Sequence, residues 1–170
     1  ATDGTLGDLV QKLKKTYCQS IGIEYLDIPD KRQREWLQDQ MEPKLNEPQL
    51  SKQQKLWILE GLFKAEEFEM FLHTKYVGQK RFSLQGSESV IPLLEVILEE
   101  GANLGMQQAV FGMAHRGRLN VLAHTLEKPY EYIFSEFEGV FSKEELPGDG
   151  DVKYHKGFSS DRTTRWSRKT

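Results

Sequence analysis

The stretch Ala109-Val-Phe-Gly-Met-Ala-His-Arg-Gly-Arg-Leu-Asn-Val-Leu122 decides the fold class that the sequence predicts. Residues 109–113 form a continuous apolar run, bounded by polar residues, with the length of a buried strand. Helical spacing of apolar residues follows from Leu119 to Leu126. A strand, a loop and a helix in this order predict an α/β fold. Because one strand cannot form a sheet, we expect only the opening of such a domain.

The residues that precede this stretch are predicted to form helices over positions 1–75. A first helix is indicated by an apolar stripe at helical spacing, and a second, over residues 30–42, by Asp30 as its cap. A long amphipathic helix begins near Ser51 and ends before Gly78. The apolar stripe of the first helix consists of Leu6, Leu9, Val10, Leu13 and Tyr17. We therefore divide the chain into a helical region, 1–75, and the start of an α/β domain, 76–170.

Two further helices are predicted within the second region. One begins between Ser87 and Ser89, because Pro92 is tolerated only in a first turn, and it ends at Gly101. The other has Pro129 at its first position and closes at Gly139.

Composition excludes several classes of protein. The 170 residues carry a formal net charge of −3, which argues against a uniformly basic nucleic-acid binder. A single cysteine, Cys18, closes no intrachain disulfide, and no spacing of His, Cys and Asp predicts a metal site. The longest apolar run, residues 90–98, contains Glu95 and is too short to span a membrane, and no secretion signal is visible. We expect a protein of the cytoplasm or, in a eukaryote, of the mitochondrial matrix.

The loop after the predicted strand is the first candidate site. In α/β domains such a loop lies in the ligand crevice, where the next helix presents free backbone N–H groups. His115, Arg116 and Arg118 would add positive charge there, suited to a carboxylate or a phosphate. A histidine also exchanges a proton near neutral pH. The alternative is that His115 caps a helix and that the arginines form ordinary surface ion pairs.

A second candidate loop, Asp151-Val-Lys-Tyr-His155-Lys-Gly-Phe-Ser-Ser160, lies in the basic last twenty residues of the chain. A histidine beside a lysine, followed by two hydroxyls, is able to bind an anion. The alternative is a solvated surface loop. Whether His155 lies near His115 depends on the fold.

Three long stretches resemble, in this order, signatures of the thiamine-dependent 2-oxoglutarate dehydrogenase component. They are His73-Thr-Lys-Tyr-Val-Gly-Gln-Lys-Arg-Phe-Ser-Leu-Gln-Gly86, Gly112-Met-Ala-His-Arg-Gly-Arg-Leu-Asn-Val-Leu122 and Gly150-Asp-Val-Lys-Tyr-His-Lys-Gly-Phe-Ser-Ser160. The segment Thr16-Tyr-Cys-Gln-Ser-Ile-Gly-Ile-Glu-Tyr25 resembles the helical region before the catalytic domain of that family. The resemblance implies a thiamine-diphosphate-binding α/β domain, of which this chain contains the first, incomplete part.

The resemblance also implies roles for individual residues. His115 and His155 match the active-site histidines, and Arg116 matches an arginine that contacts the cofactor. Phe82 and Ser159 match positions that line the substrate pocket. Enzymes of the family decarboxylate 2-oxoglutarate on thiamine diphosphate with Mg²⁺. They then transfer the succinyl group to the lipoyl domain of a dihydrolipoyl succinyltransferase, and the resemblance implies a homodimer when full length.

The sequence departs from the family after the second histidine loop. The motif that holds magnesium and the diphosphate is absent from these residues, as is the domain that binds the pyrimidine ring. We therefore expect a truncated chain that is inactive alone. For the end of the chain, partial disorder after Leu146 is an alternative, because the sheet neighbours that would order it are missing. Two alternatives are a segment of the 2-oxoadipate dehydrogenase paralogue, whose substrate is one methylene longer, and a module whose amphipathic N-terminal helices serve assembly of the complex.

Overall fold

The computed structural model describes residues 4–139 and 157–164. The chain forms two compact units, residues 1–51 and residues 52–170. His155 and most of the segment after Leu146 lie outside the described residues, so the predictions for them are not addressed by the fold.

The first unit contains helices α1 (Leu6–Tyr17) and α2 (Lys31–Met41) and the short 3-10 helix η1 (Glu42–Lys44). At the start of α1, Thr5 N–H donates to Asp8 Oδ2 at 2.7 Å, and Asp8 N–H donates to Thr5 Oγ1 at 3.3 Å. These reciprocal bonds form a capping box, which satisfies N–H groups that a helix end otherwise leaves unpaired. Asp30 Oδ1 accepts from Arg32 N–H at 2.7 Å, which confirms the predicted cap of α2.

Two tyrosines connect the elements of the first unit. The rings of Tyr17 and Tyr25 are stacked with their centroids 6.2 Å apart. Tyr17 O–H donates to Glu42 Oε1 at 2.8 Å, and Gln38 Nε2 donates to the Tyr25 hydroxyl at 2.9 Å. Of the predicted apolar stripe of α1, only Tyr17 enters this contact, and Leu6, Leu9, Val10 and Leu13 are all exposed.

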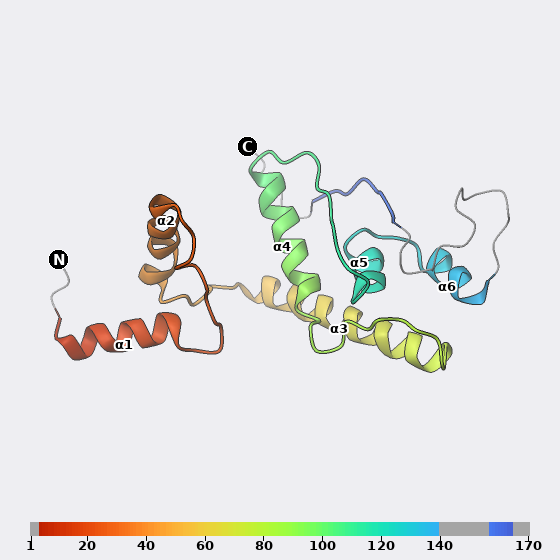
Figure 1. Ribbon diagram of the computed structural model, residues 1–170, viewed down its shortest axis with the longest axis horizontal. Helices are drawn as coiled ribbons and strands as arrows, with labels where there is room; N and C mark the ends of the chain where they lie inside the picture. The colour runs from red at the N-terminus through yellow and green to blue at the C-terminus, as the bar shows by residue number, and fades with distance from the viewer. Residues whose placement is uncertain (1–3, 140–156, 165–170) are drawn as a thin grey trace. The chain divides into compact units, whose positions relative to one another are not determined.

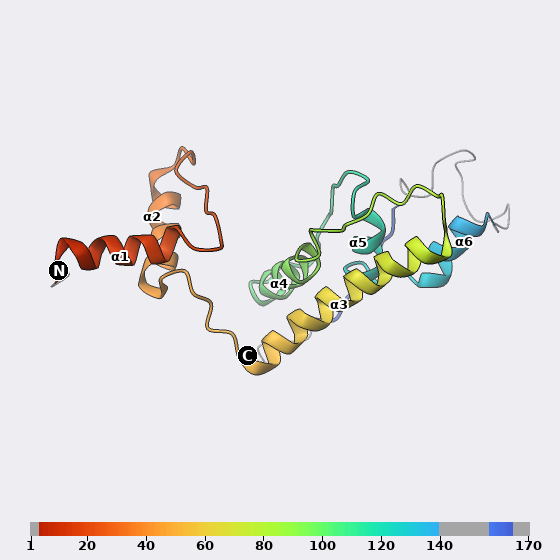
Figure 2. The same cartoon turned by 90° about the horizontal axis from the view of Figure 1, so that it is seen from below.

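The second unit is built on the long helix α3 (Lys52–Lys75). Helices α4 (Val90–Asn103), α5 (Arg118–His124) and α6 (Tyr130–Glu138) follow it. Figures 1 and 2 show α4, α5 and α6 one after another along the same side of α3. Helix α5 contacts α3, α4 and α6, so it lies at the centre of the unit.

Two groups of buried side chains form the core of the second unit. The larger group joins α3, α5 and α6, and the smaller joins α3, α4, α5 and the turn before α4. Because a seven-residue helix is unstable alone, α5 depends on these contacts on both of its sides. The larger group is Phe68, Leu72, Tyr76, Leu119, Leu122, Ala123, Ile133 and Phe137, and the smaller is Ala65, Leu84, Ile91 and Val121.

Most helix boundaries agree with the sequence patterns. Helix α4 begins at Val90, so Pro92 lies in its first turn as predicted, and Gly139 ends α6 with a φ of 68°. The predicted end of α4 at Gly101 is early, since the helix continues to Asn103. Pro129 caps α6 instead of forming its first residue.

Helix α3 differs from its prediction as a one-sided amphipathic helix. Its first half exposes large apolar side chains, and Leu56, Leu59 and Phe63 are each about half exposed. The sequence of α3 therefore has more apolar positions on its surface than this unit buries.

The predicted strand over residues 109–113 is wrong for this structure, which has no strand in its described parts. The segment is irregular, and Val110 is 97% exposed. A strand needs a neighbour for its N–H and C=O groups, and no described segment supplies one. The helical prediction for the N-terminal region is confirmed, whereas the α/β domain and its boundary at residue 76 stay predictions.

Within residues 4–139 and 157–164, the structure has no helix that is both long and apolar enough to cross a membrane.

Substitution of a core leucine should separate buried from exposed positions. Leu72 is 1% exposed and Leu104 is 88% exposed. We expect Leu72→Ala to lower the free energy of unfolding by about 2–5 kcal/mol, because it removes buried methyl groups and leaves a cavity. Leu104→Ala should change it by less than about 0.5 kcal/mol. Equal effects of the two substitutions in chemical denaturation would contradict the assigned core.

Candidate functional site

Two predicted site residues, Phe82 and His115, are brought together by the fold. Their ring centroids are 4.0 Å apart, with an angle of 48° between the planes. Phe82 lies in the connection between α3 and α4, and His115 lies in the loop that leads into α5. The candidate site is therefore the junction of these two connections.

The backbones of the two connections are also joined. Gly117 N–H donates to the Phe82 carbonyl at 2.8 Å, and the Arg116 guanidinium donates to the Ser83 carbonyl at 3.4 Å. Phe82 has a φ of 45°, a region that costs free energy for a residue with a side chain. Such strain persists only where surrounding contacts over-determine the conformation, and here those contacts hold the ring beside His115.

Gly117 allows this close approach. Its φ is 72°, and a Cβ placed on it would lie 2.4 Å from Leu84 Cδ1. Leu84 is itself buried in the smaller core group. The backbone conformation therefore favours glycine at this position, and a side chain would also force the buried Leu84 side chain to shift.

Arg118 forms hydrogen bonds within its own loop. These bonds close the loop and do not open it toward a ligand. Arg118 N–H donates to the His115 carbonyl at 3.1 Å, and Arg118 Nη1 donates to the Met113 carbonyl at 2.9 Å. Because the N–H groups of Gly117 and Arg118 are both engaged, the predicted free donors at the start of α5 are wrong at these two positions. His115 and Arg116 remain exposed, and they supply the polar chemistry of the junction.

A buried acid that the sequence analysis missed lies behind this junction. Glu69 is 8% exposed, and its Oε1 accepts from Leu84 N–H at 3.0 Å and from Asn120 Nδ2 at 3.3 Å. Its Oε2 lies 3.8 Å from Arg81 Nε. A signal was present in the spacing, because Glu69 shares the helix face of the buried Ala65, Phe68 and Leu72.

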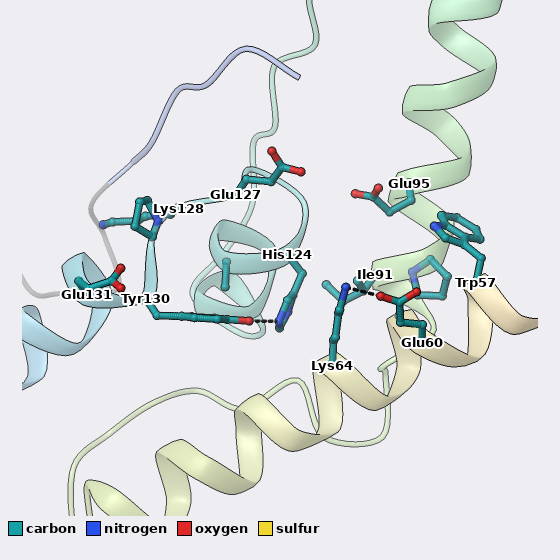
Figure 3. Close-up of a pocket in the computed structure, with 14 residues that line it drawn as sticks. Trp57, Glu60, Lys64, Ile91, Glu95, His124, Glu127, Lys128, Tyr130 and Glu131 are labelled. Carbon is teal, nitrogen blue, oxygen red and sulfur yellow. Dashed lines mark hydrogen bonds and ion pairs between the residues drawn. The ribbon is translucent and has the colours of Figure 1, made fainter. Parts of the chain in front are cut away.

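Asn120 extends the polar contacts to a histidine. Asn120 is fully buried, its Nδ2 donates to the Ala65 carbonyl at 2.9 Å, and its Oδ1 lies 2.7 Å from His124 Nδ1. His124 Nε2 lies 3.0 Å from the Tyr130 hydroxyl. Figure 3 marks this contact with a dashed line. Burial is the main cause that lowers the pKa of His124 to about 4, with a smaller contribution from the charge of Lys64. The ring is therefore neutral at pH 7 and serves as a packing and hydrogen-bonding group.

His124 also lines a pocket of about 350 Å³ between α3, α4, α5 and the start of α6. Figure 3 shows that Lys64, which contributes to this wall, pairs with Glu60, and the two charged atoms are 2.6 Å apart. The lining of the pocket contains neither Phe82 nor His115.

Ser159 lies elsewhere, in a separate cleft. That cleft is formed by α4, the segment 106–111 and residues 159–164, and its lining also contains neither Phe82 nor His115. The neighbouring Arg162 holds this last segment in place. Its guanidinium forms a two-pronged pair with the Glu95 carboxylate and donates to the Thr125 carbonyl at 2.7 Å. The described structure thus does not join Ser159 to the His115 junction.

In the described ranges, no group of three or more His, Cys, Asp or Glu side chains is arranged to hold a metal ion.

No family model matches this sequence. The chain is 48% identical over 156 residues to the multifunctional 2-oxoglutarate metabolism enzyme of Mycolicibacterium vanbaalenii, which covers 92% of this chain and 12% of that protein. It is 48% identical over 160 residues to the 2-oxoglutarate dehydrogenase E1 component of Cupriavidus necator, covering 94% of this chain and 17% of that protein. With the E1 component of Brucella ovis, the identity is 45% over 159 residues, 93% of this chain and 16% of that protein.

Identity at this level over nearly the whole chain indicates common descent with a dehydrogenase component. By sequence, the chain is homologous to a segment of 2-oxoglutarate dehydrogenase E1 components. It spans 12–17% of the length of these curated relatives.

The close approach at Gly117 is testable with a matched glycine. Gly117→Ala should lower the free energy of unfolding by more than about 1 kcal/mol, since the new Cβ clashes with Leu84 and also meets an unfavourable φ. Gly139 has a similar φ, 68°, but no atom within 4 Å of a built Cβ. Gly139→Ala should therefore cost only the backbone strain. Equal losses in chemical denaturation would show that the Leu84 contact does not constrain the loop.

The lowered pKa of His124 predicts how stability changes with pH. In the unfolded chain the pKa of this histidine is about 6.5, whereas in the folded unit its pKa is about 4. Between these values the unfolded state binds more protons, so stability is full above about pH 6.5 and falls as the pH decreases toward 4. His124→Gln should flatten this part of the curve of unfolding free energy against pH. An imidazole NMR titration of His124 with a midpoint near 6.5 would contradict the assignment.

Proposed function

We propose that this chain forms part of a thiamine-diphosphate-dependent 2-oxoglutarate dehydrogenase E1 component. The observation that carries the proposal is its 48% and 45% identity, over more than nine-tenths of the chain, to two proteins with that name. The reaction decarboxylates 2-oxoglutarate, and the succinyl group passes to a lipoyl domain of the succinyltransferase component. The junction of Phe82 and His115 supports the proposal, because it joins two of the stretches that resemble this family.

His115 is proposed to contact the substrate. Its ring is exposed at the junction and packs against Phe82, so its orientation is restrained while its polar atoms remain available. A neutral or protonated imidazole donates a hydrogen bond to an oxygen that gains negative charge, and such a bond strengthens in the transition state. Phe82 is proposed to provide an apolar wall on one side of the imidazole.

Arg116 is proposed to bind an anionic group of the cofactor. Its guanidinium is exposed, lies in the same loop as His115 and carries several donors, and this chemistry fits the oxygens of a diphosphate. When bound, thiamine diphosphate supplies the carbon that adds to the keto group and accepts the electrons released on decarboxylation. A magnesium ion is expected with the diphosphate, and we assign no described residue to it.

The α/β fold of the second region is part of the same proposal. We place residues 76–170 in an α/β domain of the complete protein, in which the exposed segment 109–113 is covered by neighbouring elements. The apolar composition of the segment and the exposure of Val110 support this, since such a segment gains free energy when it is covered. In that setting His155 is a second active-site histidine, and Ser159 contributes to the substrate pocket.

Assembly is the proposed role of the first helix. Leu6, Leu9, Val10 and Leu13 form an exposed stripe on α1, and an apolar stripe of this kind is typical of a surface that binds a partner. In a complete E1 component the partners are a second copy of the chain and the succinyltransferase. The cytoplasm, or the mitochondrial matrix of a eukaryote, is the proposed location.

The proposal is tested by substitution in the complete protein that carries this sequence. With thiamine diphosphate, Mg²⁺ and 2-oxoglutarate, His115→Ala should lower kcat/KM for release of carbon dioxide by about 10²–10⁴-fold, the usual contribution of a positioned acid or base. Arg116→Ala should raise the concentration of thiamine diphosphate needed for half activity.

Arg32→Ala is the control, because Arg32 is an exposed arginine of α2 in the other unit. It should leave both quantities unchanged. A wild-type protein that releases no carbon dioxide from 2-oxoglutarate, or a His115→Ala variant with full activity, would refute the proposed function.

A further inference from the structure

The contact between Phe82 and His115 joins two irregular connections, and neither connection is held by regular secondary structure. A ring pair in such a place keeps its geometry only if each partner is fixed to a rigid element. Helix α3 is the longest helix of the second unit and contacts α4 and α5, the helices that follow the two connections.

Glu69 of α3 contacts the first connection and the helix that follows the second. Its Oε1 accepts from Leu84 N–H at 3.0 Å, two residues after Phe82 in the chain. The same oxygen accepts from Asn120 Nδ2 at 3.3 Å, on the helix that the His115 loop enters. One buried oxygen atom therefore connects the backbone that carries Phe82 with the helix that follows His115.

The surroundings of Glu69 show why its carboxylate is needed as the acceptor for the Leu84 N–H group. The residue is 8% exposed, and Arg81, whose Nε lies 3.8 Å from Oε2, is the cation beside it. An N–H group such as that of Leu84 costs free energy when it is buried without an acceptor. Removal of the carboxylate would leave that group unsatisfied and would release the turn that carries Phe82.

We propose that Glu69 is a positioning residue that holds Phe82 and His115 in contact by binding the Leu84 backbone and the Asn120 side chain together. It touches neither ring and acts through the two segments that carry them. The effect of Glu69 on the reaction rests on the proposed function, whereas its role in holding Phe82 and His115 in contact does not.

The role of Glu69 in the contact between the two rings is tested in this chain by NMR. Cross-relaxation between the ring protons of Phe82 and His115 reports their contact. Glu69→Ala should abolish that signal while the helical circular dichroism is retained. Glu69→Gln should preserve it, because the amide oxygen still accepts from Leu84 and Asn120. Rescue by glutamine would separate a specific hydrogen-bonding role from a general need for an acid.

Glu136→Ala is the matched control. Glu136 of α6 is also 8% exposed, and its carboxylate pairs at 2.7 Å with Lys128, in the connection between α5 and α6. It should lower stability to a similar extent and leave the ring contact intact. If Glu136→Ala also abolishes the signal, the contact depends on general stability and the proposal is overturned.

If Glu69→Ala does not fold, Glu69→Asp is the milder substitution that tests the same role. Glu69→Asp shortens the side chain by one methylene, so its carboxylate cannot keep both hydrogen bonds, and it should weaken the ring contact. If a folded Glu69→Ala or Glu69→Asp variant gives the full cross-relaxation signal, the proposal is overturned.

Activity of the complete protein provides the second measurement. Glu69→Ala should lower kcat/KM for 2-oxoglutarate by about 10–100-fold, the scale expected when reacting groups are displaced by about 1 Å. Glu69→Gln should remain within about 3-fold of the wild type, since its hydrogen bonds maintain that geometry. An inactive wild type would refute the proposed function alone, because the NMR result still decides the role of Glu69. An active wild type with an equally active Glu69→Ala variant would overturn the positioning role.

Discussion

Helix α5 is held between two groups of buried side chains, and its attachment to α3 determines where the functional loop lies. Leu119 and Leu122 join the larger group, and Val121 joins the smaller. Asn120 lies between them, fully buried, and donates to the carbonyl of Ala65 on α3. A polar side chain in such a place is tolerated only with its partners present, so the register of α5 on α3 is fixed. The loop before α5 inherits that register.

The position of His115 follows from this register and from a second constraint at Gly117. The glycine N–H donates to the Phe82 carbonyl, and the absence of a side chain allows Leu84 to approach. The loop is thus attached to α3 through its helix and to the connection after α3 through its backbone. Strain at Phe82 is the cost of that arrangement, and it is offset by the buried contacts around Leu84.

Sequence patterns predicted the positions of the helices well because helical periodicity and capping residues are local signals, although the apolar faces of α1 and of the first half of α3 stay exposed. The stripe of α1, the cap at Asp30 and the glycine after α6 all followed from local chemistry. The strand over 109–113 failed for the opposite reason, since a strand depends on a neighbour that no local pattern supplies. Glu69 was overlooked because a charged residue at a helical core position is easily taken for surface, although its spacing placed it on the buried face.

The amino-acid sequence by itself determined the helical content, the loop that carries His115 and Arg116, and the resemblance to the E1 components. These properties depend on short-range spacing or on the order of residues, and both can be seen in a single amino-acid sequence. Only the tertiary structure decided that Phe82 and His115 touch, that Arg118 closes its own loop and that Ser159 lines a different cleft. Contacts between residues far apart in the chain depend on how α5 packs on α3, and no local pattern specifies that packing.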